Sequence, residues 1–249
     1  MEKPFAIKLA GIVIGIHPLF PEIREMCRDY LTNESPEFEI SVSLEDICFE
    51  RQKSDREAII EGRKPSQYSD AYWETLAVYR KIAEKLVQYD VMLFHGSAVA
   101  VDGIGYLFTA KSGTGKSTHT RLWREYFGDR AVMVNDDKPL LKITQNGVIA
   151  FGTPWDGKHH LNNNISVPLK AICILTRDKC NHIEMINKRM AFPILCQQSY
   201  RPNDPTALSK TISLLDKLES FVELYQLGCN MELSAAAVAY SGMNKQERR

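Results

Sequence analysis

The sequence predicts an α/β protein with a central mixed sheet, hairpins at the edge of that sheet and a helical C-terminus, preceded by a small α+β subdomain. Short apolar runs, which are typical of buried strands, follow one another between residues 91 and 186. Two turns between these runs carry the hairpin dipeptides Asp102-Gly103 and Asn146-Gly147. Segments with apolar residues at helical spacing flank the runs, at residues 69–86 and 206–226. Strands bracketed by such helices favour the α/β class.

The length and composition are ordinary for a globular protein. The 249 residues suit a small domain and a larger one, predicted as residues 1–68 and 69–249. Lysine plus arginine equals aspartate plus glutamate, at 31 each, so no global positive field favours nucleic acid or an anionic membrane. The six cysteines lack paired metal-site spacing, and the N-terminus lacks a signal-peptide pattern. No apolar run is long enough for a membrane span, so we expect a cytoplasmic protein.

The small subdomain is predicted to combine strands with one helix. Apolar side chains alternate along residues 5–16, and Gly11 interrupts the alternation, which indicates a bulge or turn. We expect a helix over residues 22–31 and a second strand-like segment over residues 38–49. Residues 51–67 are polar and charged, which indicates an exposed connection or a short helix and turn.

The larger domain is predicted to begin with a helix that Ser69 caps and that places Trp73 on an apolar, core-facing stripe. Strands are then predicted at residues 91–101, 104–109, 130–134, 140–143, 148–151, 171–176 and 182–186. Further helices are predicted at residues 116–127 and 206–226, and Ser234 is the candidate cap of a last short helix.

A phosphate-binding loop is the strongest motif in the sequence. An apolar strand ending at Thr109 is followed by Ala-Lys-Ser-Gly-Thr-Gly-Lys-Ser-Thr and then by a helix. In such a loop, backbone N–H groups and the helix N-terminus surround a phosphate chain. Gly113 and Gly115 allow the backbone to approach closely. The motif usually begins with glycine, and Ala110 in that place indicates a backbone conformation that an L-residue can adopt.

The motif predicts a role for each residue of the loop. Lys116 is expected to reach the β- and γ-phosphates of a nucleotide, and the Ser117 hydroxyl is expected to bind Mg²⁺. The predicted nucleotide contacts are Ser112, Gly113, Thr114, Gly115, Lys116, Ser117 and Thr118.

An acidic pair, Asp136-Asp137, follows the predicted strand at residues 130–134. If this strand lies beside the strand that precedes the phosphate loop, the two carboxylates lie close to the metal. One carboxylate can then hold Mg²⁺, and the other can accept a proton from an attacking hydroxyl. His95 lies in an apolar strand, where a histidine is as readily a core residue as an active-site residue.

A polar segment at residues 153–164 is a further candidate, because loops at strand ends often build binding sites. Lys158 or His159 could contact the γ-phosphate or the acceptor, and Asp156 could orient one of them. The alternative is a surface loop between strands. Arg121 lies one helical turn beyond Ser117 and could face nucleotide or solvent.

These motifs together resemble the HPr kinase/phosphorylase family. The resemblance covers residues 91–176 and rests on His95-Gly96, the Asp102-Gly103 hairpin, the phosphate loop and Asp136-Asp137 in the family's order. It implies a phosphate-loop fold similar to that of HPr kinases and phosphoenolpyruvate carboxykinases. The family's glycine-rich signature segment is not recognisable here, nor is the N-terminal domain of its long members. The chain is more similar to the short HPr-kinase-like proteins of bacteria.

The resemblance implies an ATP-dependent kinase that transfers the γ-phosphoryl group of Mg-ATP to a serine-type hydroxyl on a small molecule, peptide or protein. It implies that Asp136 is the general base, that Asp137 and Ser117 bind Mg²⁺, and that His95 lies beside the acidic pair. Lys116 would complete the catalytic set. Members of the family are often oligomeric, so a homo-oligomer is consistent with the resemblance.

Two other functions stay open at this stage. The chain could be a nucleotide-dependent switch with little transfer chemistry, or a carboxykinase-like enzyme acting on a carboxylic acid. A carboxykinase needs clustered cations, for which Lys158 and Arg177 are scattered candidates. A hydrolase is less favoured, because the adjacent His159 and His160 would point to opposite faces of a strand and could not easily bind one metal ion.

Overall fold

The computed structural model describes residues 2–60 and 62–245. Backbone contacts divide the chain into two compact units, Met1–Lys85 and Leu86–Arg249. The sequence placed the boundary after residue 68, and the difference is helix α3 (Asp70–Leu86), which lies almost wholly in the first unit. Among the described residues, no helix has the length and apolar character needed to cross a membrane.

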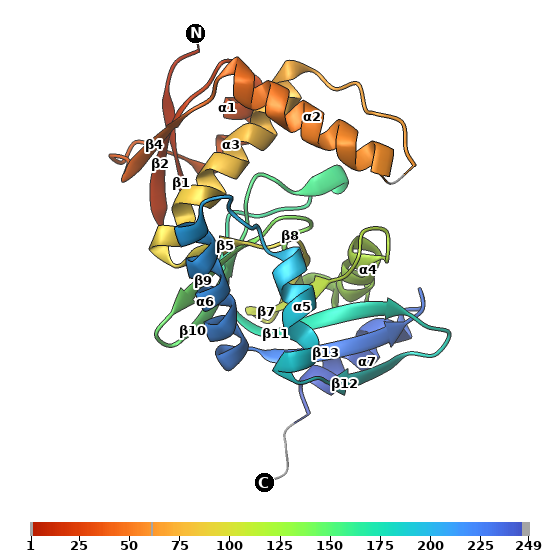
Figure 1. Cartoon of the computed structure of the whole chain (residues 1–249). Helices are drawn as coiled ribbons and strands as arrows, with labels where there is room; N and C mark the ends of the chain where they lie inside the picture. The colour runs from red at the N-terminus through yellow and green to blue at the C-terminus, as the bar shows by residue number, and fades with distance from the viewer. Residues whose placement is uncertain (1, 61, 246–249) are drawn as a thin grey trace. The chain divides into compact units, whose positions relative to one another are not determined.

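The N-terminal unit contains a four-stranded sheet in the order β3-β1-β2-β4, with its helices on one side (Figure 1). Its elements are β1 (Phe5–Leu9), β2 (Ile12–His17), α1 (Glu22–Met26), η1 (Arg28–Tyr30), β3 (Leu31–Thr32), β4 (Phe38–Ser41), α2 (Leu44–Ile60) and α3. Ala10 and Gly11 both have positive φ, at 52° and 82°, and make the tight β1–β2 turn that the interrupted alternation predicted. The Ser69 hydroxyl accepts a hydrogen bond from the N–H of Tyr72 at 3.3 Å, which confirms the predicted cap of α3.

Helix α2 corrects one prediction for this unit. The strand predicted over residues 38–49 ends at Ser41, and of the two alternatives for residues 51–67 the helix is the one observed, as far as Ile60. The physical reason is a cap: the Ser43 hydroxyl accepts from the N–H of Asp46 at 3.3 Å, and the Asp46 carboxylate accepts from the N–H of Ser43 at 3.0 Å.

The second unit is built on a nine-stranded mixed sheet. Its first elements are η2 (Val87–Tyr89), β5 (Val91–Leu93), β6 (Ser97–Val101), β7 (Ile104–Thr109), α4 (Lys116–Phe127), η3 (Gly128–Arg130), β8 (Ala131–Asn135), β9 (Leu140–Thr144), β10 (Gly147–Phe151) and η4 (Gly157–His159). They are followed by β11 (Ser166–Arg177), β12 (His182–Met185), α5 (Lys188–Gln198), α6 (Pro205–Phe221), β13 (Glu223–Cys229) and α7 (Ser234–Met243). The main strand order is β5-β9-β10-β11-β7-β6-β8, and β13 joins β11 to β12.

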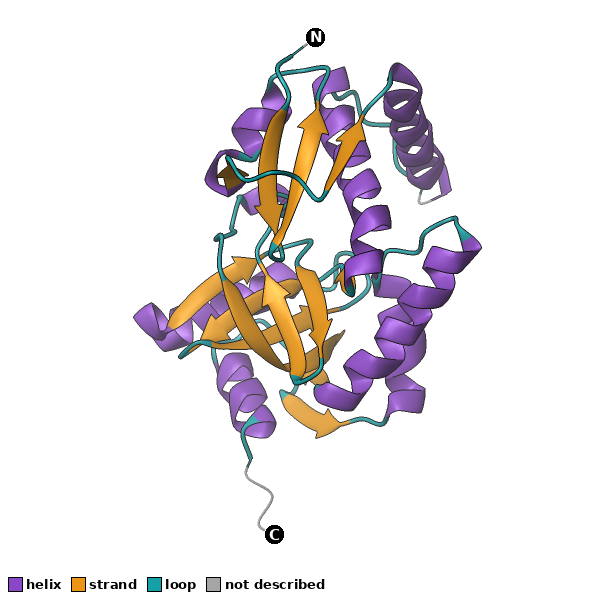
Figure 2. Cartoon of the chain, turned by 90° about the vertical axis from the view of Figure 1, so that its left-hand side faces the viewer, coloured by secondary structure: helices purple, strands orange, loops and turns teal. Residues whose placement is uncertain are grey.

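Strand β11 is the centre of this sheet. Its first residues pair antiparallel with β10, and the rest lies between β7 and β13, to both of which it is parallel. A strand covered on both faces is expected to be apolar throughout, and residues 171–175 are all buried. The secondary structure is coloured in Figure 2, where the strands of each sheet are orange.

Helices pack against both faces of the sheet of the second unit. On one face, Leu107 of β7 belongs to a core that includes Leu195 of α5 and Leu215 of α6. On the other face, Phe108 belongs to a core that includes Trp123 of α4 and Ala239 of α7. Alternate residues of one strand therefore face different layers, and the predicted α/β class with a mixed sheet and flanking helices is confirmed.

Most elements of the second unit fall where they were predicted, with three corrections. The single strand predicted over residues 91–101 is two strands, because β5 pairs with β9 while β6 pairs with β7 and β8, and His95 lies between the two strands. The helix predicted over residues 206–226 ends at Phe221, because residues 223–226 leave it to pair with β11 as the start of β13. Helix α5 was not predicted. Asn187 caps it: the Asn187 side chain accepts a hydrogen bond from the N–H of Met190 at 3.1 Å. The helix contains Pro193.

Candidate phosphoryl-transfer site

The segment predicted to bind phosphate connects the end of β7 with the start of α4. Gly113 has a φ of 78° and Gly115 a φ of 123°, conformations that L side chains rarely adopt. The N–H of Thr114 donates to the carbonyl of Lys111 at 3.2 Å and closes a turn within the loop. Ala110 is not among the described residues with positive φ, so alanine fits the place where the motif usually has glycine.

Lys116 is the first residue of α4, and its side chain lies against the start of the loop. Its ammonium donates to the carbonyl of Ala110 at 3.3 Å. Burial lowers the pKa of Lys116, while the negative charges of Asp137 and Asp136 act in the opposite direction. Two hydrogen bonds bring the acidic pair and the start of the loop to the same place: the N–H of Gly96 donates to the carbonyl of Asp137 at 3.0 Å, and the Thr109 hydroxyl donates to the carbonyl of His95 at 3.0 Å.

The acidic pair reaches α4 through a buried chain of hydrogen bonds. The condition that its strand lies directly beside the loop strand is not met, because β6 lies between β7 and β8. Ser97 of β6 makes the connection: its hydroxyl donates to Oδ1 of Asp136 at 2.6 Å and lies 2.9 Å from Oγ1 of Thr120 in α4. Ser97, Thr120 and Asp136 are at most 5% exposed, so this chain is shielded from solvent.

Asp137 points to different partners. Its Oδ1 lies 3.4 Å from Nε2 of His95, and its Oδ2 accepts from the ammonium of Lys138 at 2.6 Å. Burial alone would raise the pKa of Asp137, but the hydrogen bond from His95 and the charge of Lys138 outweigh it and hold that pKa well below its usual range. Asp137 is therefore a carboxylate at neutral pH.

Asn135 shapes the turn that carries the pair. Its Oδ1 accepts from the N–H groups of Asp137 and Lys138 at 2.8 and 2.6 Å, an Asx-type turn. Its Nδ2 donates to the carbonyls of Thr153 and Trp155 at 2.9 and 3.3 Å. Asn135 thus fixes both the acidic pair and the start of the polar segment, although the sequence analysis gave it no role.

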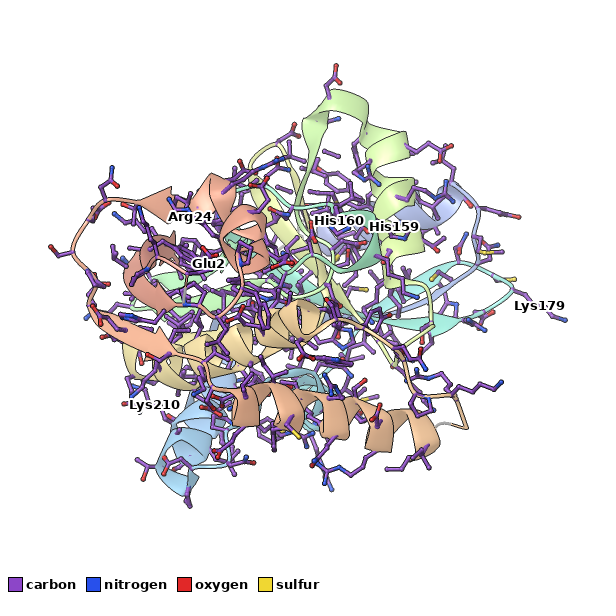
Figure 3. The ribbon with its side chains drawn as sticks, turned by 90° about the horizontal axis from the view of Figure 1, so that it is seen from above. Glu2, Arg24, His159, His160, Lys179 and Lys210 are labelled. Atoms are coloured by element: carbon purple, nitrogen blue, oxygen red, sulfur yellow. The ribbon has the colours of Figure 1, made fainter. Side chains whose placement is uncertain are left out.

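The polar segment of residues 153–164 contacts the acidic pair. A Cβ built on Gly157 would lie 3.1 Å from the Cβ of Asp137. The buried Asp156 was predicted to orient Lys158 or His159, but its carboxylate accepts from Nδ2 of Asn162 at 2.6 Å and lies 3.3 Å from Nδ1 of His160. The i,i+4 spacing brings His160 to Asp156, whereas Lys158 and His159 are exposed on η4. Figure 3 labels His159 and His160 side by side.

Sequence analysis also missed Ser97, Thr120 and Lys138 as members of the site. Lys138 carried a signal, since it directly follows the acidic pair. Ser97 and Thr120 carried none: Ser97 is one hydroxyl in an otherwise apolar strand, Thr120 is one of several polar residues of α4, and only the folded chain brings them into contact. Arg121 faces solvent: it is exposed and bonds Glu125 at 3.2 Å.

The oxygen atoms of this site suit Mg²⁺, which prefers hydroxyl, carboxylate and phosphate ligands and keeps several waters. Ser117 offers a hydroxyl in the first turn of α4, and Asp137 offers an ionised carboxylate. Across residues 2–60 and 62–245, no group of three His, Cys, Asp or Glu side chains could hold a metal by itself. A metal here would share its coordination with a ligand such as a nucleotide.

A sequence model of a known protein family matches residues 63–203, more than half of the chain, and its description is SynChlorMet cassette protein ScmC. The chain belongs to the ScmC family. The segment matched to ScmC contains the phosphate loop, the acidic pair and η4. Comparison of the ScmC-family sequence with curated proteins gives no significant match. Among solved structures, the ScmC-family chain is similar to the Hpr(Ser) kinase/phosphatase from Coxiella burnetii, at 11% sequence identity and a TM-score of 0.34, over 60% of this chain and 94% of that one.

Proposed function

We propose that this chain binds Mg-ATP and transfers its γ-phosphoryl group to a hydroxyl of a small molecule, peptide or protein. The observation that carries the proposal is the link between the acidic pair and α4: Asp136 is joined through Ser97 to Thr120, whose hydroxyl oxygen lies 3.3 Å from the carbonyl oxygen of Lys116. A glycine-containing loop with a lysine binds phosphate groups, and a pair of carboxylates can bind a metal ion and accept a proton. Convergence of the two sets within one site is what phosphoryl transfer requires.

The phosphate loop supplies the binding energy for the triphosphate. Its N–H groups and the N-terminal end of the α4 dipole favour negative charge at the loop. Lys116 exchanges its bond with the Ala110 carbonyl for the β- and γ-phosphates. Ser117 and Asp137 would hold Mg²⁺, which would supply positive charge next to the phosphate oxygens.

Asp136 is the proposed general base. Its Oδ1 is held by Ser97, and its Oδ2 has no hydrogen-bond partner in the described chain. Oδ2 takes the proton of the acceptor hydroxyl while the oxygen of that hydroxyl bonds to the γ-phosphorus and ADP leaves. Asp137 keeps its negative charge beside His95 and Lys138, so the two adjacent carboxylates have separate tasks.

The test is the variant Asp136→Asn, which keeps an oxygen for Ser97 but cannot take a proton. We expect it to bind Mg-ATP as the wild type does and to lose turnover of labelled ATP by about 10²-fold or more, the usual contribution of a general base. The first assay measures ATP hydrolysis, with water as the phosphoryl acceptor. The same assay is then repeated with added hydroxyl compounds as acceptors. Asp129→Asn, at an exposed site in η3, is the matched control. Turnover by Asp136→Asn within tenfold of the wild type would remove Asp136 from the mechanism.

A further inference from the structure

Arg177 binds the phosphate loop from the side. It is the last residue of β11, and Ile174 of β11 pairs in parallel register with Thr109 at the end of β7. The carboxyl end of β11 therefore lies beside the loop, just before the connection whose tip carries Lys179 (Figure 3). Nη2 of Arg177 donates to the carbonyl of Gly113 at 2.6 Å, and its Nε donates to the carbonyl of Thr114 at 3.4 Å.

These two bonds fix two peptide groups of the loop. In a planar trans peptide the C=O and the N–H point in opposite directions. The carbonyl of Gly113 shares a peptide with the N–H of Thr114, which donates to Lys111, so this peptide is held on both sides. The carbonyl of Thr114 shares a peptide with the N–H of Gly115. When Arg177 holds that carbonyl, the N–H of Gly115 is turned away from Arg177.

The N–H of Gly115 has no hydrogen-bond partner among the residues that the structure describes. It lies directly before the first turn of α4, where a phosphate would be bound. Gly113 and Gly115 flank Thr114, and two glycines so close together leave a loop with many accessible backbone conformations. A loop of this kind needs a contact from outside the loop to hold a single backbone conformation.

We infer that Arg177 is a positioning residue that holds the phosphate loop in its binding conformation, with the N–H of Gly115 directed to the phosphate chain. The inference rests on the proposed function for the identity of the ligand, a nucleoside di- or triphosphate. Its physical basis is preorganisation: a loop that is already ordered loses less conformational freedom when the ligand binds. The planar guanidinium suits this task, since it presents several donors in one rigid arrangement, which an ammonium does not.

The experiment compares Arg177→Met, Arg177→Lys and the control Arg121→Met in the full chain. Arg121 is an exposed arginine of α4 that bonds Glu125 and does not contact the loop. Two quantities are measured: amide hydrogen exchange of residues 112–116 without nucleotide, and the Kd values of Mg-ATP and Mg-ADP. For Arg177→Met we expect faster exchange at Thr114 and about tenfold weaker binding of both nucleotides, the size of one charge-assisted hydrogen bond. Arg177→Lys should recover part of this loss, and Arg121→Met should match the wild type.

Three outcomes separate the claims. Wild-type exchange and affinity in Arg177→Met would overturn the inference and leave the proposed function intact. A loss confined to Mg-ATP would also overturn it, because Arg177 would then contact the γ-phosphate and not position the loop. If the wild type binds neither nucleotide, the proposed function fails, and the exchange of Thr114 still decides whether Arg177 holds the loop.

Discussion

Replacing Ser97 with alanine removes the buried link between the acidic pair and α4. The Ser97 hydroxyl has one proton, which it donates to Oδ1 of Asp136 at 2.6 Å, so the contact with Thr120 at 2.9 Å uses the proton of Thr120. Ser97 is 0% exposed, and no water can replace its hydroxyl without a rearrangement. A hydrogen bond to a charged group contributes about 1.5–3 kcal/mol, and we expect Ser97→Ala to lose that amount of unfolding free energy. Thr120→Val leaves the bond to Asp136 in place and removes a neutral hydroxyl, which lies near Ser97 and the carbonyls of Lys116 and Ser117, so it should cost about 1 kcal/mol.

Urea unfolding of Ser97→Ala, Asp136→Ala and the double variant measures the coupling free energy between Ser97 and Asp136. Two groups in contact are expected to couple by about 0.5–3 kcal/mol, so the double variant should lose less than the sum of the single losses. Because the chain has two compact units, the variants are compared only where their denaturant slopes agree with that of the wild type. A coupling energy below about 0.5 kcal/mol would refute the reasoning, since it would mean that the buried chain of hydrogen bonds contributes nothing specific.

Two further predictions concern pH. In the folded chain the pKa of Asp137 lies below its ordinary value of 3.8, because the effects of His95 and Lys138 outweigh the effect of burial. The ionised Asp137 therefore stabilises the fold fully above pH 3.8, and this stabilisation is lost as the pH falls through the lower, folded-state pKa. Urea unfolding between about pH 5 and 2 should show the wild type losing its advantage over Asp137→Asn, and parallel curves would contradict this. Burial lowers the pKa of His119 from 6.5 to about 3, so the histidine takes up a proton on unfolding between those values. The unfolding free energy should therefore fall by about 1.4 kcal/mol per pH unit below pH 6.5, and His119→Gln should reduce that slope; an unchanged slope would contradict it.

The parts of the fold that depend on neighbouring residues were predictable from sequence. The Asp102-Gly103 turn and the cap at Ser69 are short-range signals, and both were confirmed. Residues 223–226 were misassigned because the apolar spacing of α6 continues into them, while their strand conformation depends on pairing with β11, about fifty residues earlier. The start of α2 was different: the cap formed by Ser43 and Asp46 is present in the sequence and was overlooked.

The same distinction applies to the site. The phosphate loop and Asp136-Asp137 are each contiguous in sequence, so their chemistry could be predicted from residue type and spacing. Ser97 and Arg177 could not be found in this way, because their roles depend on partners at least twenty-three residues away. Which strand separates the loop from the acidic pair is also a property of the sheet order and not of any local pattern.

The most direct test of the account is the thermal stabilisation of the chain by Mg-ATP, for the wild type, Lys116→Ala and the control Lys111→Ala. Lys111 is an exposed lysine of the same loop, whereas Lys116 is partly buried and coupled to the acidic pair. At a hundredfold excess over Kd, a ligand that binds only the folded state adds about 2.7 kcal/mol of stability. The account predicts a clear rise in Tm for the wild type and Lys111→Ala and none for Lys116→Ala. No rise in the wild type, or an equal rise in all three proteins, would contradict it.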